Sequence, residues 1–230
     1  MARALSMILC CPLALALAPA TAGAMCIDIS YRVMAFSSDG ESVLLEENGF
    51  GPEGGGSLAY LLLSGAHPWA TRFVVTSNYS PGDGSTPETI SVAALQKTLR
   101  GLAEAVKRKK LLGVQVGAAG AQRGGLVTIQ PAAAKAVTTL RAVRDEIAAG
   151  SLRITIREKR LAIADRDGGS PMLTLWEPID SLRGVSASIA PGGKLLVLRR
   201  DNGRCSRDIA VLHTRSGRSG DLRHLSLPTR

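Results

Sequence analysis

Three histidines, His67, His213 and His224, are the side chains that could act as a general base near neutral pH. Nucleophilic hydrolysis needs such a base beside a hydroxyl and a carboxylate, and these groups meet in space rather than in sequence. His67, in a short Gly-Ala-His-Pro-Trp loop, and Asp83, in a later turn-rich loop, suit these roles best. Because no Gly-x-Ser-x-Gly elbow accompanies them, a secreted hydrolase using His67 is an alternative, and a non-enzymatic protein is favoured.

Two short motifs look like ligand loops but lack groups that the ligands need. Residues 49–54 fit Gly-x-Gly-x-x-Gly, but Pro52 removes an N–H, Glu53 adds negative charge, and no helix follows directly. Residues 165–169 place two carboxylates before two glycines, without the acidic residue that closes a calcium loop. The sequence has no Cys-x-x-Cys and no His-x-x-x-His pair. We therefore expect no metal and no cofactor.

Charged side chains supply the candidate binding groups. The chain has 28 Lys and Arg against 19 Asp and Glu, a formal net charge of +9, and its C-terminal part is rich in arginine. The candidate binding residues are Glu46, Glu47, Glu53, Arg199, Arg200, Arg204 and Arg207. Outside the cytoplasm, excess arginine suits lipid headgroups, anionic surface polymers or acidic proteins. Only 3% of the residues are aromatic, so few side chains could stack on bases, and no nucleic-acid partner is expected.

The N-terminus has the three parts of a secretory signal peptide. Arg3 precedes an apolar run over residues 5–17, and Ala22-Gly23-Ala24 supplies a small-x-small cleavage site. We expect residues 1–24 to be removed and the product to be periplasmic or secreted. The apolar run is too short to span a bilayer core of about 30 Å, and no later segment is long and apolar enough, so no transmembrane segment is expected after cleavage.

Cleavage would leave two of the four cysteines, Cys26 and Cys205. In an oxidising compartment an even pair favours a disulfide, which here would close a loop of nearly the whole mature chain. A loop of that length is worth about 4–5 kcal/mol in the chain-entropy model. Two free thiols are the alternative, because the sequence alone does not decide whether the two residues pair.

We expect a single domain, residues 25–213, to position the candidate catalytic and binding side chains. The Arg- and Ser-rich tail, residues 214–230, is expected to fray. Alternation of apolar and polar residues predicts strands over 27–36, 42–47, 57–64, 72–78, 126–130, 152–156, 161–164, 172–176, 185–189, 194–199 and 208–213. The first four of these segments are expected to form a meander of about four strands. The strands over 152–156 and 161–164 should form a hairpin.

Two helices are expected in the middle of the chain. The first begins at Thr86-Pro87-Glu88, with a hydroxyl N-cap and proline at the first helical position, and ends at Gly113. Its apolar stripe is Leu95, Leu99, Leu102 and Val106. The second spans residues 131–149 and ends at Gly150; its apolar face is Val137, Leu140, Val143 and Ile147. The expected fold class is therefore α+β, a largely antiparallel β-sheet with two helices packed on it.

Two turn segments carry a resemblance. Phe36-Ser37-Ser38-Asp39-Gly40 is followed by Glu46-Glu47, Gly54-Gly55-Gly56 and Tyr60, and Ala190-Pro191-Gly192-Gly193 forms a second hairpin turn. This order resembles an uncharacterised family of predicted secreted bacterial proteins with propeller-blade-like (S-x-D-G) hairpins. Gly192 stands where that pattern usually has Asp. The resemblance implies secretion and a β-rich fold, and no mechanism. The unit does not recur at the ~40–50-residue spacing of propeller blades, so a complete propeller is not expected.

These observations favour a non-enzymatic binding or scaffold module of the cell envelope, whose partner is an anionic polymer or another protein. The alternatives are a hydrolase using His67 and a cationic binder of anionic surface polymer. Each makes a different structural prediction. A hydrolase requires His67 near a carboxylate and a hydroxyl in one cleft. A polymer binder requires most C-terminal arginines on one face, and a scaffold requires a contiguous exposed apolar patch.

Overall fold

The computed structural model describes residues 28–50, 56–77, 90–117, 127–129, 137–166, 172–173, 175, 178–201 and 207–228. Within these ranges the protein consists mostly of antiparallel strands, and its single long helix is α1 (Val92–Arg108). The expected α+β arrangement with two helices is therefore wrong. The expected signal segment, residues 1–24, and both cysteines of the expected disulfide, Cys26 and Cys205, lie outside the described residues.

Three meanders of consecutive strands make up most of the fold. The first contains β1 (Asp28–Phe36), β2 (Ser42–Phe50), β3 (Gly56–Ser64) and β4 (His67–Ser77). The second contains β8 (Ile147–Ala149), β9 (Leu152–Arg157), β10 (Arg160–Asp165) and β11 (Met172–Leu173). The third contains β12 (Val185–Ile189), β13 (Leu195–Asp201), β14 (Arg207–His213) and β15 (Arg223–Leu225), and β7 (Thr138–Arg141) pairs with β12 at its edge. Smaller elements are the ribbon of β5 (Val114–Val116) and β6 (Val127–Ile129) and the 3₁₀ helices η2 (Pro191–Gly193) and η3 (Ser219–Asp221).

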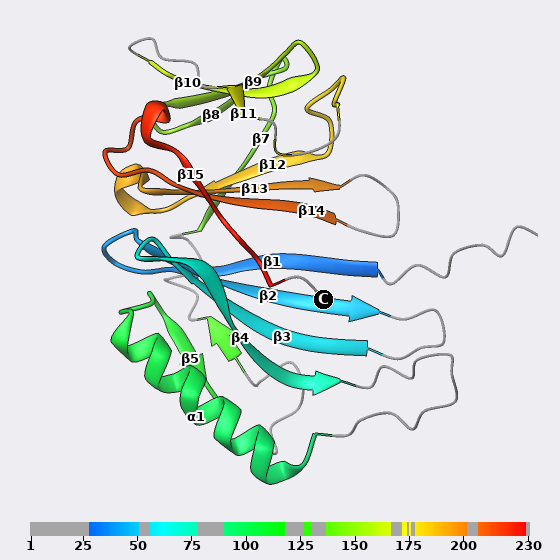
Figure 1. The fold of residues 1–230 in the computed structure, drawn as a ribbon, viewed down its shortest axis with the longest axis vertical. Coiled ribbons are helices and arrows are strands. Elements are labelled where there is room, and N and C mark those ends of the chain that lie inside the picture. The colour runs from blue at the N-terminus through cyan, green and yellow to red at the C-terminus, as the bar shows by residue number, and fades with distance from the viewer. Residues whose placement is uncertain are drawn as a thin grey trace, which may run out of the picture.

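The sheets and the helix stack in layers (Figure 1). Leu102 of α1 packs with Tyr60 on one face of the β1–β4 sheet. The other face packs on the β12–β15 sheet, where Leu63 and Val197 share a core. The next residue, Leu198, points to the opposite face of β13 and packs against the β8–β11 sheet. The β12–β15 sheet is thus the inner layer between the other two sheets, so the order of the layers differs from the order of the sheets along the chain.

Helix α1 carries the predicted apolar stripe but begins at Val92. Ser91 is its N-cap, because the Ser91 hydroxyl accepts a hydrogen bond from the Ala94 N–H at 3.2 Å. The expected start, residues 86–88, lies outside the described residues. Leu99, Leu102 and Val106 are buried against the first sheet, as predicted. No helix in the described part of the chain combines the length and apolarity needed to cross a bilayer.

The expected second helix over residues 131–149 is wrong in the part that the structure describes. β7 and β8 occupy it, and the turn between them places both Arg144 (φ 51) and Asp145 (φ 61) in the left-handed region. Val143 and Glu146 exchange backbone hydrogen bonds of 2.8 and 3.2 Å across this turn. These features define a two-residue hairpin of the I′ kind. The apolar spacing fits a helix locally, but pairing of β7 with β12, which lies far along the chain, determines the structure.

Part of the expected frayed tail, residues 214–230, belongs to the core. β15 pairs with β14, and Leu225 is fully buried. Beyond it, the Ser226 N–H donates to the Pro68 carbonyl at 2.6 Å, and the Ser226 carbonyl accepts from the Ala70 N–H at 3.2 Å. The C-terminal segment therefore ties the third sheet to the edge strand of the first sheet.

The two hairpins that resemble each other in sequence are both present, and their turns touch. Gly40 has φ 70, and a Cβ on it would lie 2.1 Å from the Pro191 carbonyl oxygen. Beside this contact, Glu41 and Lys194 form an ion pair of 2.9 Å. The hydrogen bond from Lys194 to Glu41 raises the pKa of the lysine. The two turns therefore fix the first and third sheets to each other at one end.

Candidate functional site

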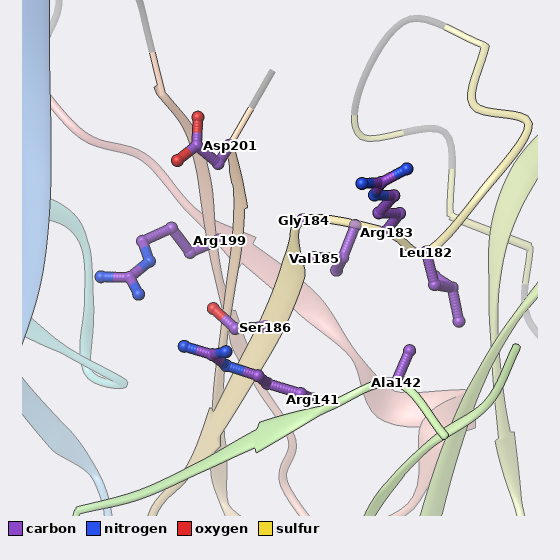
Figure 2. Close-up of a pocket in the computed structure, with 9 residues that line it drawn as sticks. All are labelled: Arg141, Ala142, Leu182, Arg183, Gly184, Val185, Ser186, Arg199 and Asp201. Carbon is purple, nitrogen blue, oxygen red and sulfur yellow. The ribbon is translucent and has the colours of Figure 1, made fainter. Parts of the chain in front are cut away.

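A pocket of about 570 Å³ lies where β7, β13 and the turn before β12 meet (Figure 2). Its polar side chains are Arg141, Arg183, Ser186, Arg199 and Asp201. Three guanidinium groups against one carboxylate make the lining positively charged. Arginine stays protonated at any physiological pH, so this charge does not depend on titration.

Strand register brings two of these arginines together. Arg141 on β7 lies opposite Ser186 on β12, and Ser186 lies opposite Arg199 on β13. Residues directly opposite one another in a sheet point to the same face. Figure 2 shows both guanidinium groups extending to the same side, with the Ser186 hydroxyl between them. Ser186 thus sits in the middle of a row of three side chains that donate hydrogen bonds.

The two arginines of this row differ in their other contacts. Arg199 donates from Nη1 to the Tyr31 carbonyl oxygen at 3.0 Å, which holds its side chain against β1. Arg141 is exposed, and no hydrogen bond or ion pair joins it to another residue that the structure describes. The pocket therefore combines one anchored guanidinium with one that can turn toward a ligand.

A close approach of two backbone segments shapes the other side of the pocket. Gly184 has φ 80, and a Cβ on it would lie 2.8 Å from the Asp201 carbonyl oxygen. The Asp201 N–H donates to the Gly184 carbonyl at 3.0 Å. Glycine is required at such a position because a side chain would be strained and would collide. Figure 2 shows Arg183 across this turn from Arg199, so positive charge lies on both sides of the pocket.

A second pocket, of about 320 Å³, surrounds a carboxylate that already has several donors. Arg32 forms a 3.0 Å ion pair with Glu46, Asn48 donates to Glu46 at 3.0 Å, and the Tyr60 hydroxyl donates at 3.4 Å. Burial and the nearby Glu46 carboxylate raise the pKa of Tyr60. These bonds join the polar groups of this pocket to one another, which suits a structural network better than a binding site.

The acidic candidates do not form a common surface. Glu46 and Glu47 are neighbours on β2 and point to opposite faces of the sheet. Glu47 is buried and forms an ion pair of 3.0 Å with Arg72. Glu53 lies outside the described residues. The described carboxylates of this group are thus engaged within the fold.

The basic candidates are also divided. Arg199 and Arg200 point to opposite faces of β13, and the Arg200 guanidinium lies 3.8 Å from Asp208. Arg204 lies outside the described residues, and Arg207 begins β14, where the structure describes only its backbone. Of the basic candidates, Arg199 lines the larger pocket. The alternation of strand residues therefore separates Arg199 from Arg200.

The histidines lie apart from both pockets. His67 is exposed at the start of β4, and it lines neither of them; its expected partner, Asp83, lies outside the described residues. His213 is only 6% exposed, and neither ring nitrogen has a hydrogen-bond partner among the described residues. Burial, reinforced by the positive charge of Arg223, lowers the pKa of His213. The hydrolase alternative requires His67 in a cleft, and His67 lines neither of these two pockets.

Sequence reasoning missed Arg141 and Arg183. Arg141 follows Thr138-Thr139-Leu140 in the segment expected to be helical, and Arg183 precedes a strand as a single basic residue. The two adjacent threonines were the available signal, since β-branched residues favour strands. Even a correctly predicted strand at this position would not show which strand it pairs with. Arg141 lies opposite Ser186 because β7 pairs with β12.

The chemistry of the larger pocket is that of oxyanion binding. Guanidinium groups donate charge-assisted hydrogen bonds in a planar fork that matches carboxylate, phosphate and sulfate oxygens. Among the described residues, no group of three or more His, Cys, Asp or Glu side chains could hold a metal ion. Comparison of the chain with known proteins finds no matching family model, no matching curated protein and no matching solved structure.

Proposed function

We propose that the protein is a non-enzymatic binding module of the cell envelope and that the pocket formed by β7, β12 and β13 binds an anionic ligand. The observation that carries this proposal is the row of Arg141, Ser186 and Arg199 on one face of the sheet. The two permanently charged forks and the hydroxyl of this row are donors, and they outnumber the one carboxylate of the lining, Asp201, which suits binding of an oxyanion rather than its chemical conversion.

The exposed apolar residues support a binding role over a scaffold role. The large apolar side chains exposed within the described ranges are Phe50, Trp69, Val92 and Val143. They belong to four separate elements: the end of β2, the start of β4, the start of α1 and the β7–β8 turn. A scaffold surface needs such residues to adjoin one another, and no strand pairing of the described residues places any two of these four opposite each other.

An anionic surface polymer is the ligand class that best fits the charge of the whole chain. The formal net charge is +9, and a cationic protein attracts polyanions over distances of about a Debye length. In this proposal the general charge brings the polymer to the protein, and the pocket holds an anionic group of it. The expected export of the protein would place it beside such polymers.

The proposal is tested by binding to immobilised dextran sulfate, with neutral dextran of the same length as the reference surface. The variant Arg141→Gln/Arg199→Gln removes the two guanidiniums of the row. The matched control is Arg157→Gln/Arg160→Gln, which removes two exposed arginines that lie opposite each other at the β9–β10 turn. Both variants lose the same charge, and because the pocket variant also loses the hydrogen bond from Arg199 to the Tyr31 carbonyl, its melting temperature is compared with that of wild type.

We expect the pocket variant to bind dextran sulfate at least about tenfold more weakly than the control variant, because each charge-assisted hydrogen bond is worth about 1.5–3 kcal/mol. Binding by the wild type should weaken as salt is added. Equal binding by the two variants would show that only the overall charge matters, and would overturn the assignment of the pocket.

A further inference from the structure

We infer that the pocket accepts two neighbouring anionic groups of one ligand, with Arg141 and Arg199 holding the first group and Arg183 holding the second. This inference rests on the proposed anion-binding function and specifies the ligand class. Its ligands are compounds with two adjacent anionic groups, such as a free diphosphate or consecutive anionic units of a polymer.

The spacing of the strands defines the first subsite. Neighbouring strands lie about 4.8 Å apart, so the backbones of β7 and β13 are separated by roughly 9.6 Å with β12 between them. Arg141 and Arg199 extend from these two strands on one face, above Ser186. Arg199 keeps its hydrogen bond to the Tyr31 carbonyl, and Arg141 is the guanidinium that can turn toward an oxyanion placed over the serine. The first anionic group is therefore bound by three side chains from three strands.

Arg183 defines the second subsite. It is exposed on the turn before β12, and no hydrogen bond or ion pair joins its guanidinium to another described residue. Figure 2 places it across the Gly184 turn from the first pair. The positions of Gly184 and Asp201 are fixed by their backbone hydrogen bond of 3.0 Å, so the turn cannot easily move Arg183 toward the first subsite. Arg183 therefore supplies a donor on the opposite side of the Gly184 turn from the first subsite.

The size and charge of the pocket agree with such a ligand. The pocket has a volume of about 570 Å³. One water molecule occupies about 30 Å³ in the liquid, so the pocket has more room than a single small oxyanion fills. Three arginines and one aspartate leave an excess of two positive charges in the lining. Two adjacent anionic groups balance that excess, as a single phosphate dianion also does, so the size of the pocket rather than its charge favours two groups.

Calorimetric titrations with orthophosphate and with pyrophosphate at one pH and ionic strength test the inference. We expect wild type to bind pyrophosphate about tenfold or more tightly than orthophosphate. Arg183→Gln should remove most of this preference while changing orthophosphate affinity by less than about twofold. Arg183→Lys, which keeps the charge, should retain part of the preference. Arg141→Gln/Arg199→Gln should weaken binding of both anions.

The outcomes separate this inference from the function on which it rests. If neither anion binds to wild type, the proposed function fails. If both bind, and Arg183→Gln weakens them equally or leaves the pyrophosphate preference intact, the two-group inference is overturned. Because Arg183 is exposed on a turn, we expect the circular dichroism spectrum and melting temperature of its variants to match those of wild type.

The source of the paired anions is resolved by displacement of bound pyrophosphate. Densely and sparsely sulfated dextrans are compared at equal total sulfate concentration. If the dense polymer displaces pyrophosphate at a concentration about tenfold lower, the pocket takes adjacent groups of a polymer. If neither polymer displaces it, the pocket takes a small free ligand. Displacement by the dense polymer alone supports paired anionic groups on a polymer, absence of displacement by both overturns the polymer as the ligand of the pocket, and equal displacement by the two polymers contradicts paired groups.

Discussion

Gly40 lies at the contact between the β1–β2 turn and the η2 turn, and its replacement should be costly. A Cβ would lie 2.1 Å from the Pro191 carbonyl oxygen, and φ 70 is a conformation that side chains rarely adopt. We expect Gly40→Ala to lower the free energy of unfolding by about 3 kcal/mol or more, from backbone strain together with overpacking. Urea denaturation followed by circular dichroism measures this loss.

Gly192, in the turn that touches Gly40, provides the matched control. Its φ is 73, but nothing lies within 4 Å of a Cβ placed on it. Gly192→Ala should therefore lower the free energy of unfolding only through backbone strain, by about 1–2 kcal/mol. Equal losses in the two variants would mean that the contact between the turns contributes nothing beyond backbone strain.

The residues of the pocket show what could be predicted from sequence at this scale. Arg199 was recognised as a candidate because it lies in a basic segment, and charge is visible in a sequence. Arg141 and Arg183 are isolated basic residues, separated from Arg199 by long stretches of chain. Their meeting depends on the pairing of β7 with β12 and on the conformation at Gly184. Neither feature follows from residue type alone.

The β9–β10 hairpin is an element whose turn can be improved. Glu158 (φ 49) and Lys159 (φ 58) are both left-handed, although neither residue type favours this region. A two-residue turn of this kind prefers Asn-Gly. We expect Glu158→Asn/Lys159→Gly to raise the free energy of unfolding by about 1 kcal/mol, because the native conformation becomes intrinsically favourable. Thermal and urea denaturation measure the gain.

The control for this turn is Glu158→Ala/Lys159→Ala. It removes the same two side chains, including the Lys159 amine that lies 3.7 Å from Asp180, but keeps the strained φ angles. That exposed ion pair is worth at most about 1 kcal/mol. The Ala variant should be no more stable than wild type. If it gained as much stability as the Asn-Gly variant, the left-handed backbone would not be the cause.

Local pattern predicts the elements well where the pattern is unambiguous. Strand alternation located the first meander, and the 152–156 and 161–164 strands do form the predicted hairpin. The apolar stripe of α1 is also as predicted. The prediction of a second helix is wrong because the chain turns sharply at Arg144 and Asp145. Such left-handed turns are usually recognised by a glycine, and neither of these residues is one. Apart from the two adjacent threonines of β7, the sequence of this segment displays only a helical spacing of apolar residues.

The layered arrangement of the whole molecule could not be predicted in the same way. Leu58 to Leu63 of β3 are all buried, because α1 covers one face of the first sheet and the third sheet covers the other. Such a run indicates a strand buried on both faces. It does not reveal which elements supply the covering layers, since those contacts join segments far apart in the chain.

The contact between the first and third sheets should respond to pH through His213. This side chain lies on β14 against Gly65 of the β3–β4 turn, where a Cβ would lie 2.3 Å from its Nε2 atom. Burial lowers its pKa below the ordinary 6.5, and the positive charges of Arg223, Lys194 and Arg215 act in the same direction, while Glu41 opposes them. The native state therefore favours the neutral ring.

The sign of the effect on stability follows from proton binding. Between the folded pKa and 6.5, the unfolded chain binds more protons at this site than the folded chain, so stability rises with pH. The stability that the neutral His213 ring contributes is fully present above pH 6.5 and is lost as the pH falls through the pKa of the folded state. His224 is exposed, and the partial desolvation of its ring lowers its pKa in the same direction.

We expect the melting temperature of wild type to fall between about pH 7.5 and pH 5.5, a window in which ordinary carboxylates stay ionised. The fall should be smaller in His213→Gln, and His224→Gln should show how much of it the second histidine contributes. Titration of the His213 ring protons by NMR measures its pKa directly in the folded wild type, whatever the stability of the variant. A pKa at or above 6.5 would mean that the site between the sheets accepts the charged ring, and the pH dependence would then need another origin.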